Sequence, residues 1–323
     1  MEFGEIHLST ITIDRGVEAV LRSGKIVEMA DLPHLKHTIE RAFDSLLTSL
    51  RPEPMGDDRF RVHSEANRFG RVFGGQMIAQ AMQAAATTVD DKPPHSLHAY
   101  FVQSGNPDHP LDVAVDRVRD GRSMAARRVA VEQGGNTLLI AMVSFHDNPT
   151  EPEFAKRTPH GVDPDELPRL QDWVESAPEG LIERARTWIS RPPPLDMRIA
   201  EPTCFFGGPR ATGPRSHWMR LPRAVGDDPV LHSVLLAYAT DYLLLDIALR
   251  GHPEPVSVES STAFSLDHSI WLHRPVQFDR WHSHTAELLA VAGHRGLVRG
   301  AVHDIDGHLV ASTTQEVLIR ANR

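Results

Sequence analysis

The second half of the sequence repeats the pattern of the first half at a constant offset of 172 residues. Arg127 aligns with Arg299 at this offset, and the same offset carries Gly135 onto Gly307 with no gap between the two pairs. A β-prone segment precedes each glycine and another follows it. A repeat of this length makes each half a structural unit of the same kind. We therefore expect an α+β protein with two repeats, each a long helix wrapped by an antiparallel sheet.

Each repeat is expected to contain one main helix and several short strands. An Ala- and Met-rich stretch over 76–89 predicts the helix of the first repeat, and a long apolar run over 231–250 predicts that of the second. Strands are predicted over 111–119, 123–132 and 137–146 in the first repeat, and over 195–200, 216–221 and 309–319 in the second.

The segments outside the two repeats have a different character. Residues 148–194 are rich in proline and charge, which is typical of a linker, and they contain one helical pattern around 178–190. The first forty or so residues hold a short β-prone run over 11–13 and a helical pattern over 38–50. We therefore divide the chain into an N-terminal accessory extension over 1–41, a first repeat over 42–147, the linker over 148–194 and a second repeat over 195–323.

Composition limits the partners of the chain. With 323 residues, 41% of them hydrophobic, it can bury a large core. Its formal charge of −9 gives no general attraction to phosphate backbones or anionic lipid, which argues against nucleic acid as a partner. No apolar run reaches the roughly 18–20 residues of a membrane span, and no basic-then-apolar leader or C-terminal Ser-Lys-Leu signal is visible. We expect a cytoplasmic protein without stable membrane insertion.

Two carboxylates lie on the predicted helix over 231–250. The residues three and four positions before and after Asp241 have largely apolar side chains. Asp246, in contrast, has Arg250 four residues later as a possible cation partner. An unpaired buried carboxylate costs several kcal/mol and must find hydrogen-bond donors or serve a purpose. Asp241 is therefore either a structural hydrogen-bonding group or a functional one, and the helix alone leaves both open.

Two further features have the same ambiguity. Gln315 shares a face of the last strand with Thr313 and with apolar residues, so it belongs either to a core network or to a site. Gly74 and Gly75 precede the first helix, where glycines let a ligand approach free backbone amides at the positive helix end, although an ordinary glycine turn has the same sequence.

Other kinds of chemistry have weaker support. The segment over 265–275 contains serine, aspartate and histidine, but the chain lacks the Gly-x-Ser-x-Gly elbow of a nucleophilic serine. No His-Glu-x-x-His or similar ligand spacing occurs, so neither a metal nor another cofactor is expected. The single cysteine, Cys204, lies beside two phenylalanines and is interpreted as a small apolar filler, with a reactive thiol as the alternative.

Five motifs in order along both halves resemble the TesB-like acyl-CoA thioesterases, and the likeness extends from about residue 42 to the end of the chain. They are VFGGQ at 72–76, DGRS at 120–123 followed by Arg127 and Arg128, AYATDY at 237–242, LDHS at 266–269 and ASTTQE at 311–316. The resemblance implies two fused hotdog folds, in agreement with the internal repeat.

The resemblance also implies a mechanism. The catalytic aspartate, hydroxyl residue and glutamine of the family fall on Asp241, Ser265 and Gln315, which would hold the water that attacks a fatty acyl-CoA thioester of medium to long chain. Bacterial members carry threonine where this chain has Ser265, and some eukaryotic members carry serine. The resemblance also implies assembly as a homodimer or homotetramer. The residues expected to bind the acyl-CoA substrate are Gly74, Gly75, Gln76, Arg127, Arg299 and His268.

Two other functions fit parts of the sequence. An enoyl-CoA hydratase of hotdog type pairs an aspartate with a histidine, which Asp267 and His268 could imitate. A non-catalytic acyl-CoA sensor would bind the thioester without turnover. The thioesterase is preferred because the acid, the hydroxyl and the amide all fall where the family has them.

Overall fold

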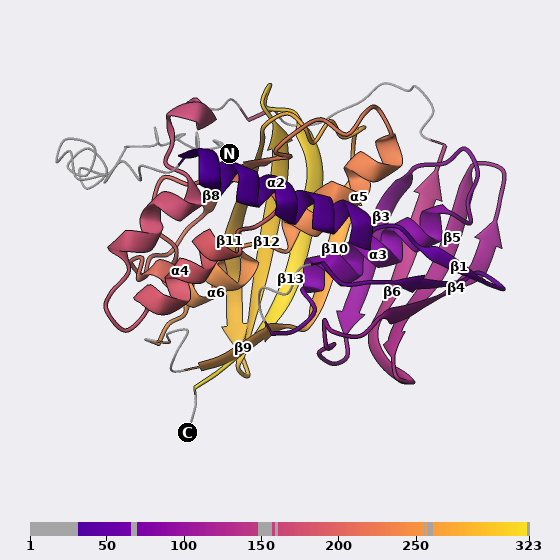
Figure 1. Cartoon of the computed structure of the whole chain (residues 1–323), viewed down its shortest axis with the longest axis horizontal. Helices are drawn as coiled ribbons and strands as arrows, with labels where there is room; N and C mark the ends of the chain where they lie inside the picture. The colour runs from indigo at the N-terminus through magenta and orange to yellow at the C-terminus, as the bar shows by residue number, and fades with distance from the viewer. Residues whose placement is uncertain are drawn as a thin grey trace, which may run out of the picture.

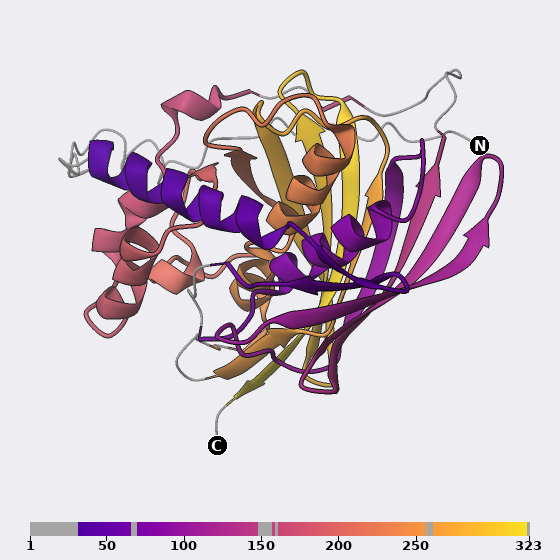
Figure 2. The same cartoon turned by 45° about the vertical axis from the view of Figure 1, so that its right-hand side comes forward.

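The computed structural model describes residues 32–65, 70–147, 157–158, 161–254, 256 and 261–321. The predicted β-prone run over 11–13 lies outside the described residues. The dominant feature is one antiparallel sheet that curves around the central helices (Figure 1, Figure 2).

The strand order of the sheet confirms the internal repeat. The order β1-β2-β4-β5-β6-β3 in the first half is matched by β7-β8-β11-β12-β13-β10 in the second, and β3 pairs with β10 where the halves meet. A further strand, β9, pairs with β13 off this path. The bounds are β1 Glu53–Gly56, β2 Arg59–Val62, β3 Pro94–Phe101, β4 Leu111–Asp120, β5 Met124–Gln133, β6 Asn136–His146, β7 Asp196–Arg198, β8 Arg215–Arg220, β9 Ser261–Ser265, β10 Asp267–Leu272, β11 His282–Ala292, β12 Arg295–Asp304 and β13 Leu309–Ala321.

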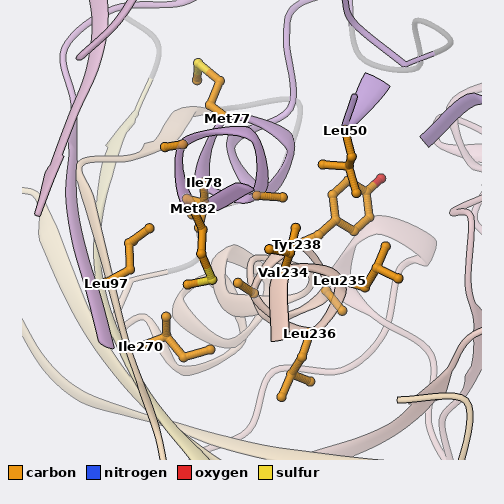
Figure 3. Packing of buried hydrophobic residues seen from close by; sticks show 14 of the residues in the cluster. Leu50, Met77, Ile78, Met82, Leu97, Val234, Leu235, Leu236, Tyr238 and Ile270 are labelled. Atoms are coloured by element: carbon orange, nitrogen blue, oxygen red, sulfur yellow. The ribbon is translucent and has the colours of Figure 1, made fainter. Parts of the chain in front are cut away.

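Two helices fill the concave side of the sheet. They are α3 (Gly74–Ala86) and α5 (Pro229–Thr240). Alanine and methionine have high helix propensity, and small alanines let the two helices approach closely. Met82 of α3 and Val234 of α5 are fully buried and lie between the helices, above Ile270 of the sheet (Figure 3). Burial of α3 and α5 against each other and the sheet forms the main core.

The prediction of a single long helix over 231–250 is wrong. Helix α5 ends at Thr240 with Asp241 as its C-cap, and α6 (Leu244–Gly251) begins after Leu243, whose φ is 64°. A branched side chain in this left-handed region costs about 1 kcal/mol or more, so the break is imposed by tertiary packing and not by local propensity. The break places the carboxylate of Asp241 at a helix end.

The segment Pro229–Arg250 is long enough and apolar enough to cross a membrane, whereas no apolar run of that length was expected from the sequence. In the fold, 83% of its most apolar window is buried inside the protein. Its hydropathy is accounted for by its position in the core.

The remaining helical segments lie outside the central pair of α3 and α5. They are α2 (Leu32–Ser49), the 3₁₀ turns η1 (Pro164–Glu166), η2 (Leu170–Ser176) and η3 (Cys204–Phe206), and α4 (Ile182–Ser190). Helix α2 begins earlier than predicted, and the predicted division between residues 41 and 42 falls within it. Its side chains Phe43 and Leu46 are fully buried in the main core, to which both halves of the chain contribute.

Helix α6 is held by a buried ion pair. Asp246 is fully buried and forms a 2.8 Å ion pair with Arg215 of β8, while the charge of Arg250, the possible partner in the sequence, acts on it more weakly. Its Oδ1 accepts a 2.6 Å hydrogen bond from the backbone N–H of Cys204. Burial and the Asp246 charge raise the pKa of Cys204 to about 12, so the thiol stays protonated and is not a nucleophile.

Candidate active site

The carboxylate of Asp241 lies where the end of α5 meets the start of α3. The backbone N–H of Gly75 donates a 2.8 Å hydrogen bond to Asp241 Oδ2, joining residues 166 positions apart in the sequence. A Cβ on Gly74 would lie 2.8 Å from the same oxygen, and one on Gly75 would lie 2.4 Å from the carbonyl oxygen of Tyr238. The two glycines are therefore required by the close approach of the helices.

The second oxygen of Asp241 has a different environment. Oδ1 is shielded from solvent and has no hydrogen-bond partner among the described residues. Burial raises the pKa of Asp241 from its ordinary value of 3.8 to about 7. The Gly75 N–H opposes this rise most, followed by the Gln315 amide, which lies near without completing a hydrogen bond of good geometry, and by the charge of Arg71. A carboxylate that titrates near neutral pH is suited to general base catalysis.

Gln315 and Ser265 lie together beside this carboxylate. Gln315 is fully buried on the inner face of β13, as its alternation predicted. Its Nε2 donates a 2.8 Å hydrogen bond to Ser265 Oγ at the end of β9. Since Ser265 Oγ accepts this bond, its own proton stays available for another acceptor. The structure thus brings together the three residues expected to be catalytic.

His268 lies in this group and is bonded within it. It is fully buried, and its Nδ1 is 2.5 Å from Gln315 Oε1. Its neighbour Asp267 is on the opposite face of β10, where its Oδ1 accepts a 2.7 Å bond from the Glu316 N–H. The Asp267–His268 pair that a hydratase would need does not form. The expected role of His268 in substrate binding stays a prediction, which its full burial does not favour.

Two other predicted substrate contacts, Gln76 and Arg127, also stay predictions, although both side chains are enclosed. Gln76 is 1% exposed, and its Oε1 accepts from the Glu65 N–H while its Nε2 donates to Gln80. Arg127 is also 1% exposed, and its guanidinium binds Thr88 and Asp120. Gln76 was chosen because it starts a helix, and Arg127 because it lies on a strand. The sequence pattern gives these positions but does not reveal the distant residues that enclose the two side chains.

Arg299 occupies the matching position of the second repeat and has the opposite environment. Its side chain is 61% exposed and pairs with Glu287 at 2.6 Å. An exposed arginine remains compatible with a basic rim for an anionic ligand, which stays a prediction.

Several residues near the site were not anticipated. The hydroxyl of Tyr238 donates to the buried carboxylate of Glu65, with O–O distances of 2.9 and 2.8 Å, and contacts the hydroxyl of Tyr242. Phe73 packs edge-on against Tyr238, with 5.3 Å between ring centroids. Thr240, next to Asp241, contacts His268. The signal in the sequence was the tyrosines and threonine within an otherwise apolar helix, since buried hydroxyls require partners.

The side chains of Asp304, Asp306 and His308 lie close enough together to hold a metal ion. Its geometry is accounted for by the turn between β12 and β13. Asp304 Oδ1 accepts from the N–H groups of Asp306 and His308, and Oδ2 lies 3.0 Å from His308 Nδ1. These bonds give the cluster a structural role in the hairpin.

The fold and this site define a double-hotdog protein with one acid-centred site at the junction of its two central helices. Comparison with known proteins makes the identity more specific. Residues 62–146 match the family described as the acyl-CoA thioesterase N-terminal domain, and residues 189–318 match the family described as acyl-CoA thioesterase. The chain belongs to the acyl-CoA thioesterase family.

Individual relatives agree over nearly the whole chain. Acyl-CoA thioesterase 2 of Haemophilus influenzae is 32% identical over 282 residues, covering 86% of this chain and 97% of the relative. Acyl-coenzyme A thioesterase 8 of Rattus norvegicus is 32% identical over 289 residues, covering 85% and 89%. Among solved structures, the acyl-CoA thioesterase II TesB2 of Mycobacterium marinum has 29% identity and a TM-score of 0.69, with 86% of this chain and 98% of that chain covered. The tesB protein of Mycobacterium avium subsp. paratuberculosis has 25% identity and a TM-score of 0.71, with 86% and 99% covered.

Proposed function

We propose that this acyl-CoA thioester hydrolase acts on medium- to long-chain fatty acyl-CoA and uses Asp241 to activate a water directly, with no covalent intermediate. The observation that supports the proposal most is the position of Asp241, whose Oδ2 is held by Gly75 while its enclosed Oδ1 has no partner among the described residues. Thiol release from a ladder of saturated acyl-CoAs, short to long, tests it. No release by folded protein would contradict hydrolysis, and a preference for short chains would contradict the substrate class.

The proposed reaction begins with proton transfer to Asp241. A water held by Ser265 and Gln315 gives its proton to Asp241 Oδ1 and attacks the thioester carbonyl carbon. The first N–H groups of α3 point away from the helix without partners inside it, so an N–H of this turn can stabilise the oxyanion. When the intermediate collapses, the C–S bond breaks and Asp241 returns its proton to the departing sulfur. The products are a free fatty acid and coenzyme A, and the carboxylate is regenerated.

The activity is expected to depend on the ionisation of Asp241. Its pKa of about 7 means that kcat/KM should rise roughly tenfold per pH unit below pH 7 and level off above it, because only the carboxylate accepts a proton. Thiol release measured from pH 5 to pH 9, with the folded fraction checked at each pH, tests this dependence. A flat profile across this range would argue against Asp241 as the base.

We further propose that the protein assembles as a homodimer or homotetramer in the cytoplasm. Several large apolar side chains are exposed on the outer face of adjacent strands, including Tyr100 at 69%, Met142 at 41% and Trp271 at 38%. A grouping of this kind is typical of an interaction surface. Light scattering of the purified protein is expected to give a multiple of 35.9 kDa, and a monomeric mass would contradict the assembly.

A further inference from the structure

The imidazole of His268 links the two elements that carry the proposed catalytic groups. Its ring is fully buried, and both nitrogens contact polar side chains. Nδ1 lies 2.5 Å from Gln315 Oε1 on β13, and Nε2 lies 3.1 Å from Thr240 Oγ1 at the end of α5. The ring therefore connects the strand of Gln315 to the residue that directly precedes Asp241.

We propose that His268 is a positioning residue, which fixes the Gln315 amide with its oxygen away from Asp241 and its NH₂ group toward Ser265 and the attacking water. The inference rests on the proposed function, because the orientation matters only if Gln315 holds that water. It assigns His268 no proton transfer and no contact with the substrate.

The orientation of the amide needs such a device. The two ends of a glutamine amide have nearly the same shape, so packing alone does not distinguish the donor end from the acceptor end. In the observed orientation Nε2 donates to Ser265 Oγ at 2.8 Å, and the amide lowers the pKa of Asp241. The rotated amide would turn its oxygen toward an ionised carboxylate, and Ser265 would have to donate its proton to that oxygen instead of keeping the proton for the water. An ordered donor on the other side of Gln315 prevents this rotation.

The neutral form of His268 supplies that donor. Burial lowers the pKa of His268 to about 4, so the ring has a single proton at neutral pH. Contact with the carbonyl oxygen of Gln315 places this proton on Nδ1. Nε2 is then unprotonated and faces Thr240 Oγ1 at 3.1 Å. The Thr240 hydroxyl can donate its one proton either to Nε2 or to the carbonyl oxygen of Ala237 at 2.9 Å. An ionised Asp241 favours the NH₂ end of the amide on its side, and an Nδ1–H on the other side donates to the amide oxygen, so the two neighbours together fix the orientation of Gln315.

Two substitutions at His268 separate positioning from packing. His268→Asn keeps an N–H donor close to the position of Nδ1, whereas His268→Leu fills similar space without any donor. We expect His268→Leu to lower kcat at least about tenfold with KM changed less than about threefold, and His268→Asn to recover most of the kcat. Rates are compared per folded molecule after chemical denaturation of each variant. Equal losses in the two variants, or an unchanged kcat in His268→Leu, would overturn the positioning role.

The ring tautomer of the wild-type protein gives a readout that does not depend on the folding of a variant. We expect the ¹⁵N chemical shifts of His268 at pH 7 to report a neutral ring with the proton on Nδ1. Normal thiol release together with an Nε2–H tautomer would overturn the positioning role alone. Absence of thiol release from the folded wild type would overturn the proposed function and the positioning role with it.

Discussion

Replacing Asp241 by asparagine is expected to lower kcat about 10³-fold, within the range of roughly 10²–10⁴ for loss of a general base. Asparagine has nearly the shape of aspartate and can still accept the Gly75 N–H bond, so the junction between α3 and α5 is preserved. It cannot accept a proton from water at neutral pH. Thiol release from acyl-CoA, measured per folded molecule, reports the loss.

The same substitution is expected to stabilise the protein at pH 8. The pKa of Asp241 is raised from 3.8 to about 7 in the folded state, so between these values the folded protein binds the proton more strongly than the unfolded chain does. Stability is therefore lost as the pH rises through this window, and the cost is fully present above pH 7. The neutral amide of the Asp241→Asn variant has no charge to desolvate. A gain of about 1–3 kcal/mol in the free energy of unfolding at pH 8, absent at pH 4, is expected.

Asp246→Asn is the matched control. Both aspartates lie within the same helical region, but Asp246 is fully buried against Arg215 at 2.8 Å. Removing its charge leaves Arg215 buried without a counterion, which is expected to lower the free energy of unfolding by about 3 kcal/mol. Opposite signs of stability change in the two variants would distinguish a functional carboxylate from a structural one. A destabilised Asp241→Asn protein that retained turnover would contradict both roles given to Asp241.

The sequence predicted those parts of the fold and site that depend on local pattern. The offset between the halves predicted matching strand orders, and alternation along the last strand placed Gln315 on the inner face of the sheet. The apolar neighbours of Asp241 in the sequence indicated a buried carboxylate, which must either find hydrogen-bond donors or have a function. Ser265 had no such pattern and was assigned only by family resemblance, because its contact with Gln315 joins strands 50 residues apart.

The environments that the sequence did not predict share one physical cause, which is that partners from distant segments decide where a side chain lies and what it contacts. Arg127 and Arg299 are equivalent by sequence, yet Thr88 and Asp120 enclose the first while the second is exposed. His268 was placed on a strand correctly, but its contacts with Gln315 and Thr240 were not predicted, because they join segments far apart in the sequence. Helix propensity likewise continues through Leu243, where the structure breaks the helix.

Replacing Gly75 by alanine is expected to lower the free energy of unfolding by about 3 kcal/mol or more. Within a helix, alanine is favoured over glycine by about 1 kcal/mol, so local propensity predicts the opposite sign. The tertiary contact decides, because the new Cβ would lie 2.4 Å from the backbone oxygen of Tyr238 and 2.5 Å from the ring of Phe73. A backbone oxygen cannot rotate away, so α3 and α5 would have to separate. Chemical denaturation measures the change.

Gly180→Ala is the control for this substitution, since a Cβ there meets no atom within 4 Å. Its free energy of unfolding is expected to stay within about 0.5 kcal/mol of the wild type. Separation of the helices in Gly75→Ala would also move the Gly75 N–H away from Asp241 Oδ2, so the variant should lose turnover even where it remains folded. A Gly75→Ala protein as stable as Gly180→Ala would mean that the helices do not meet this closely, and the enclosed environment argued for Asp241 would then be wrong as well.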